Sequence, residues 1–116
     1  MITTPEIKND PMYLLLRDEN IEEFNDRKTK GEACDLVGTD LRSMDLRGLD
    51  ALGLDMSRCY LRQADLRGID FRMTKLEGAS IKGAKISGAY FPASLSPEEI
   101  TLSLLHGTCM RKSIVE

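Results

Sequence analysis

Residues 34–93 read CDLVG-TDLRS-MDLRG-LDALG-LDMSR-CYLRQ-ADLRG-IDFRM-TKLEG-ASIKG-AKISG-AYFPA, which divides into twelve units of five residues. The third residue is bulky and apolar in every unit except the fourth, which has Ala51. A period of five matches neither an α-helix nor a β-strand, so a chain that buries every fifth residue must turn at that interval. We therefore predict one interior core ladder, formed by Leu36, Leu41, Leu46, Met56, Leu61, Leu66, Phe71, Leu76, Ile81, Ile86 and Phe91.

The other positions of the unit fit the same interpretation. The second residue is Asp in seven units and the fifth is Gly in seven, and glycine accepts turn conformations that are costly for other residues. The first residue is never charged and is often small, so it can share the interior with the third. We expect the second and fourth residues, which carry most of the charge, to face water.

This pattern resembles the pentapeptide-repeat family, whose motif reads roughly Ala-(Asp/Asn)-Leu-x-x. The resemblance covers residues 34–93, about half of the chain. It implies an all-β solenoid, a right-handed, four-sided β-helix with four units in each coil, and therefore about three coils stacked at the strand spacing of about 4.8 Å. Residues twenty apart would then lie above one another, as in the ladder Leu41/Leu61/Ile81.

The flanking residues predict short helical caps, so the one structural domain divides into an N-terminal cap (1–33), the β-helix (34–93) and a C-terminal helix with a tail (94–116). Asp10-Pro11 is typical of a helix start, and a second helix over about 19–28 would place Ile21 and Phe24 on one face.

The C-terminal helix has clear start and stop signals. Ser96 and Glu99 form the pattern of a capping box with Pro97 between them, and Gly107 would end the helix. Its apolar face is predicted to be Ile100, Leu104 and Leu105. The C-terminal segment with Met110, Ile114 and Val115 is also a candidate surface for a homodimer or another partner.

The chain offers little for catalysis. It has a single histidine, His106, and no Ser or Cys with a spaced His and acid partner. Cys34, Cys59 and Cys109 are too few and too scattered for a disulfide framework or a metal site, so we interpret them as small buried or bystander thiols. We predict no catalytic, cofactor-binding or metal-binding residue, and therefore no enzyme.

Charge is the most useful functional clue. The 116 residues carry a net charge of -3, but residues 34–93 hold eight acidic and nine basic residues, a net of +1. The best understood members of the family resemble a DNA duplex and shield type II topoisomerases such as DNA gyrase. That mimicry needs a strongly acidic surface, which the near-neutral repeats lack.

Two stacks of cations would face outward, Arg42/Arg62/Lys82 and Arg47/Arg67, and these five residues are the candidate interaction surface. Neighbouring aspartates and the absence of interleaved aromatic residues argue against nucleic acid. We predict a rigid module that binds an unidentified protein, with modulation of a type II topoisomerase as the alternative. A start without signal-peptide features and the absence of a long apolar run predict a cytoplasmic protein with no membrane span.

Overall fold

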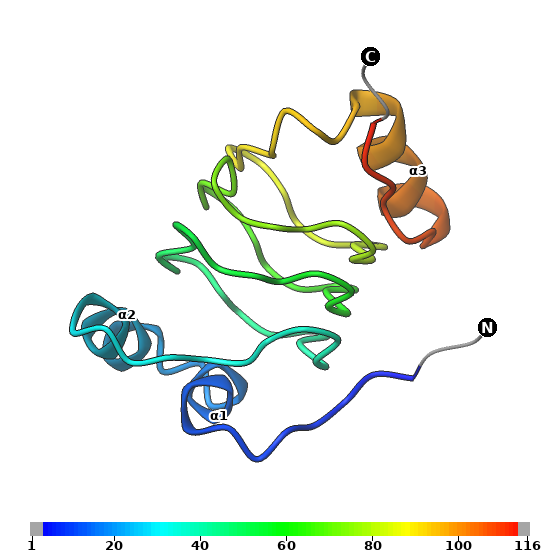
Figure 1. Ribbon diagram of the computed structural model, residues 1–116. Coiled ribbons are helices and arrows are strands. Elements are labelled where there is room, and N and C mark those ends of the chain that lie inside the picture. The colour runs from blue at the N-terminus through cyan, green and yellow to red at the C-terminus, as the bar shows by residue number, and fades with distance from the viewer. Residues whose placement is uncertain (1–3, 114–116) are drawn as a thin grey trace.

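A computed structural model describes residues 4–113 of the chain (Figure 1). It contains three helices: α1 (Pro11–Arg17), α2 (Ile21–Thr29) and α3 (Pro97–His106). Between α2 and α3 the chain winds through stacked coils. The helices α1 and α2 lie at one end of the stack and α3 lies at the other.

The coils are joined by parallel bridges between residues that are twenty apart in the sequence. Two columns of bridges each connect three coils, Asp40–Tyr60–Ser80 and Asp45–Asp65–Lys85. The chain turns between one bridge and the next, so each side contributes only one residue to the bridges between coils, and in residues 4–113 the bridges remain isolated. The regular strands that an all-β solenoid implies are therefore not formed in this range.

The predicted core ladder lies in the interior. Nine of its eleven members are no more than 2% exposed, Leu61 and Leu66 among them. Ile86 and Phe91 of the last coil are only partly buried, whereas Leu76 and Ile81 of the same coil are buried beside α3 and Met110, which bond to the backbone of Gly78, Ile81 and Gly83. The ring of Phe91 still stacks on that of Phe71, with centroids 5.9 Å apart. Burying a Leu side chain contributes about 1.5–3 kcal/mol, so the ladder is the main source of stability.

Two short helices cover the first coil. Asp10 caps α1 by accepting a hydrogen bond from the Tyr13 amide at 3.2 Å, as the sequence predicts. The core includes Phe24 of α2 and three residues of α1, Met12, Tyr13 and Leu16. The predicted start of α2 at residue 19 is wrong, because Glu19 adopts a positive φ of 57° and the helix begins at Ile21 after its cap, Asn20.

The predicted bounds of α3 are confirmed, but two predicted details are wrong. Leu105 is 61% exposed, because the face that contacts the last coil carries the fully buried Ser103, whose Oγ accepts a hydrogen bond from the Ile81 amide at 3.0 Å. Ser96 caps the helix by accepting from the Glu99 amide at 3.2 Å. The Glu99 carboxylate binds the Arg111 guanidinium at 3.0 Å, and this contact replaces the reciprocal half of the capping box.

Residues from the two flanking segments pair with the backbone of the first and the last coil. Glu6 forms a parallel bridge with Thr39 of the first coil, and Met110 accepts a hydrogen bond from the Gly78 amide of the last coil at 2.6 Å. Met110 is 1% exposed, so it is unavailable as a dimer contact in this structure, while Ile114 and Val115 lie outside the described residues.

The longest helix of residues 4–113 has ten residues and could not span a bilayer.

Candidate interaction groove

Four repeat units share the same ion-paired turn. In the unit at residues 44–48, Asp45 Oδ1 accepts hydrogen bonds from the amide of Arg47 at 3.2 Å and from its Nε at 3.0 Å, and Oδ2 accepts from Nη2 at 2.8 Å. The units of Asp40 and Arg42, Asp65 and Arg67, and Asp70 and Arg72 repeat this arrangement.

These pairs neutralise eight of the seventeen charged residues of 34–93 locally, as the spacing of acid and base in the sequence predicts. Each also has a role that the sequence analysis missed, because the aspartate accepts a backbone amide two residues along and so closes the turn. Asp side chains commonly accept a hydrogen bond from the backbone amide two residues on, and the recurrence of Asp at the second position is the sequence signal for this turn. The hydrogen bonds from Arg67 and Arg72 lower the pKa values of Asp65 and Asp70 to about 2.

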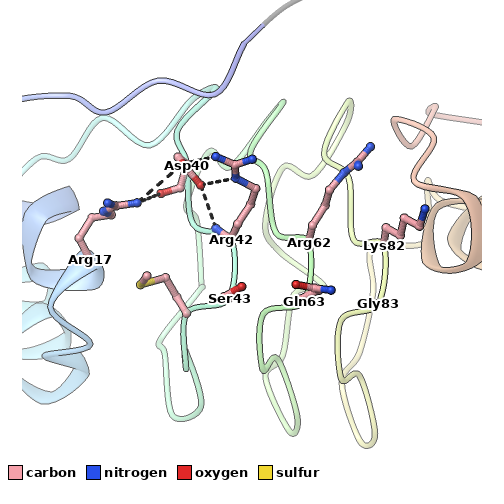
Figure 2. A pocket seen from close by; sticks show the side chains of 9 residues that line it. Arg17, Asp40, Arg42, Ser43, Arg62, Gln63, Lys82 and Gly83 are labelled. Atoms are coloured by element: carbon pink, nitrogen blue, oxygen red, sulfur yellow. Dashed lines mark hydrogen bonds and ion pairs between the residues drawn. The ribbon is translucent and has the colours of Figure 1, made fainter.

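One stack of predicted cations lines an open groove of about 700 Å³. Figure 2 shows Arg42, Arg62 and Lys82 in a row, one from each coil, with Arg17 at the end of α1 beside them. A second row runs parallel to the first and consists of Ser43, Gln63 and Gly83. The sequence predicts the first row, but it holds no signal for Arg17, because that residue reaches the groove only through the packing of α1 on the first coil.

The end of the groove nearest α1 is ion-paired. The carboxylate of Asp40 binds Arg42 at 2.8 Å and lies 3.8 Å from Arg17 Nη1. Arg17 and Tyr13 also donate hydrogen bonds to the Asp40 carbonyl oxygen, at 3.3 and 2.7 Å. The hydrogen bonds from Arg42 are the main reason why the pKa of Asp40 lies below its usual value.

The other end of the groove carries uncompensated positive charge. Arg62 donates to Ser80 Oγ and to the Gly107 carbonyl oxygen, both at 3.2 Å, and both of these acceptors are neutral. Within residues 4–113, no carboxylate lies within 4.0 Å of Arg62 or Lys82. The reason is visible in the sequence, because Tyr60 and Ser80 stand where the first coil has Asp40.

The remaining two members of the predicted surface, Arg47 and Arg67, do not line this groove. They lie on the neighbouring column, where Arg47 binds Asp45 and also lies 3.3 Å from Asp65. Arg67 binds the same Asp65 at 2.7 Å. The five predicted residues therefore separate into two sets. In the groove Arg42 is paired with Asp40, while Arg62 and Lys82 have no carboxylate partner within residues 4–113, and on the adjacent side Arg47 and Arg67 are both paired.

No three His, Cys, Asp or Glu side chains within residues 4–113 are arranged to hold a metal ion. His106 ends α3, and the three cysteines are free thiols. Cys59 is buried at a first position of the repeat, and burial raises its pKa to about 11, so its thiol stays protonated and unreactive near neutral pH.

Comparison with protein families gives one match. The model for pentapeptide repeats matches residues 32–63 and 55–91 with eight copies, so together the matches span just over half of the chain. No curated protein and no solved structure gives a match.

Proposed function

The chain belongs to the pentapeptide-repeat family, and on this premise we propose that it is a rigid, non-enzymatic module that binds another protein. The observation that carries the proposal is the row of Arg42, Arg62 and Lys82 along one groove. A stacked core holds their backbones in place, so a partner meets these side chains without first ordering a loop.

The architecture that we propose for this module is the right-handed, four-sided β-helix implied by the family. Turns at intervals of five residues and bridges at intervals of twenty support it. Residues 1–33 and 94–116 act as caps on the β-helix of residues 34–93. The cytoplasmic location stays a prediction.

The alternative function, modulation of a type II topoisomerase by DNA mimicry, has less support. A mimic of a duplex needs unbalanced negative charge, whereas Asp45, Asp65 and Asp70 are each held by an arginine of their own turn. No observation on the described residues favours this alternative over a general protein-binding role.

Photo-crosslinking tests the proposal. We would place p-benzoylphenylalanine at Gln63 in the groove or at Met73, which is 69% exposed and does not line the groove, and irradiate each variant in an extract of the organism's own cells. The expected result is a discrete protein adduct from position 63 and none from position 73. Absence of adducts from position 63 and from further probes beside Arg42 and Arg67 would contradict the proposal. Inhibition of DNA gyrase supercoiling by micromolar protein would support the alternative.

A further inference from the structure

Two polar residues that line the groove have an unfavourable backbone conformation. The fifth position of the repeat has a positive φ in most units, and glycine fills it in seven of the twelve. Three fifth-position residues with a Cβ adopt the same conformation, Ser43, Arg58 and Gln63, with φ of 62°, 59° and 61°, although it is unfavourable for them. Ser43 and Gln63 lie next to each other in the second row of the groove (Figure 2), whereas Arg58 lies outside it.

Residues held in such conformations cluster at binding and active sites. No hydrogen bond joins the side chains of Ser43 or Gln63 to another described residue, so within this range they are free to bind a ligand. A hydroxyl and an amide can each both donate and accept, which suits the alternating groups of a peptide backbone. The neighbouring row supplies free cations at Arg62 and Lys82.

We propose that this groove receives an extended acidic segment of a partner protein, with carboxylates of the segment bound by Arg62 and Lys82 and its backbone bound by Ser43 and Gln63. This inference rests on the proposed protein-binding function and names the chemistry of the partner. The lining residues include four cations, Arg17, Arg42, Arg62 and Lys82, and one carboxylate, that of Asp40.

The spacing of the groove suits such a segment. Successive coils lie about 4.8 Å apart, and alternate side chains of an extended chain lie about 6.7 Å apart on one side. The long side chains of Arg62 and Lys82 can span this difference, so acidic residues at i and i+2 each reach one cation. At the α1 end Asp40 already engages Arg42 and Arg17, so fewer cations are available there, which favours a short acidic stretch over a long one.

Nucleic acid fits the same groove less well. None of the residues that line it is aromatic, so bases have no ring to stack on. At the α1 end Arg42 and Arg17 are already engaged by Asp40. The lining cations without a carboxylate partner in residues 4–113 are therefore Arg62 and Lys82, and these two suit a short acidic stretch better than the regular phosphates of a long nucleic acid strand.

Fluorescence anisotropy with a labelled peptide of alternating Glu and Ser tests the inference directly, with a Gln and Ser peptide of equal length as the control probe. The full chain should bind the acidic peptide, more weakly at higher salt. We expect Lys82→Gln to weaken binding about threefold and the pair Arg62→Gln and Lys82→Gln about tenfold. The pair Lys75→Gln and Lys85→Gln removes the same charge outside the groove and should leave binding unchanged.

A second variant separates binding from folding. Gln63→Gly removes the amide and relieves the strained φ, so it should weaken peptide binding about threefold while the melting temperature stays equal or rises. Lack of binding by the acidic peptide at low salt, an equal loss in the Lys75 and Lys85 variant, or tighter binding of a thymidine oligonucleotide would each overturn the inference. An adduct from the crosslinking experiment without binding of the acidic peptide would overturn only the acidic chemistry and leave the protein-binding function standing.

Discussion

At the scale of single residues, this protein uses each position of the repeat for one physical task. The third position fills the interior, the second closes the turn by accepting a backbone amide, and the fourth compensates the charge of the second. Leu61 shows the first task, since it belongs to the middle coil and is fully buried. Asp65 and Arg67 show the other two.

Leu61→Ala should lower the free energy of unfolding by about 2–5 kcal/mol, because it leaves a cavity between two coils that cannot close around it. Leu52→Ala is the matched control: Leu52 is 62% exposed, and its change should stay within about 0.5 kcal/mol. Urea denaturation followed by circular dichroism measures both. Equal effects of the two substitutions would show that the ladder does not form the core.

Acid should destabilise the protein through its paired aspartates. The pKa values of Asp65 and Asp70 are about 2 in the folded chain, against about 3.9 for an unfolded Asp. The folded value is the lower one, so the stabilisation is complete above about pH 4 and is lost as the pH falls toward 2.

The double variant Asp65→Asn and Asp70→Asn tests this dependence. Asparagine keeps a side-chain oxygen for the turn amide but has no carboxylate to protonate. We expect its melting temperature to change less between about pH 5 and pH 2 than that of the unmodified protein. Parallel curves for the two proteins would contradict the assigned role of these ion pairs.

At the scale of elements, the flanking segments supply partners for coil edges that would otherwise be open. At the first coil, Glu6 bridges Thr39 and the Tyr13 hydroxyl binds the Asp40 carbonyl oxygen. At the last coil, Met110 pairs with the backbone at Gly78 and Ala79. Covered edges hinder the edge-to-edge association that exposed bridging residues invite.

Ser103→Ala should lower the free energy of unfolding by about 1–3 kcal/mol, because the Ile81 amide would lose its acceptor beneath α3. Thr101→Ala makes a similar change of side chain on the exposed side of the same helix and should be close to neutral. Thermal melting of both variants measures the difference. A Ser103 variant as stable as the Thr101 variant would show that α3 contributes little to closing the last coil.

At the scale of the whole molecule, the distribution of charge matters more than its sum. The residues outside 34–93 carry a net charge of -4, since the total is -3 and the repeats contribute +1. The segments on either side of the repeats are therefore net acidic. Arg62 and Lys82, which have no carboxylate partner within residues 4–113, line the groove on the coils between these segments. Arg42, Arg62 and Lys82 line the groove from one coil each, so a partner segment lying along it would contact all three coils at once.

The sequence by itself determined the period of the coil, the interior positions, the local pairing of Asp with Arg and the ends of α3. These features depend either on interactions between residues close in the sequence or on the same residue types recurring in successive units. Only the tertiary structure decided that Arg17 and Gln63 share a groove, that Glu99 binds Arg111 and that Leu105 faces outward. Those outcomes depend on how the helices sit on the coils, and the packing of separate segments leaves no periodic mark in the sequence. The absence of an acidic partner for Arg62 lies between the two cases, because Tyr60 is visible in the repeat while its consequence appears only once the coils are stacked.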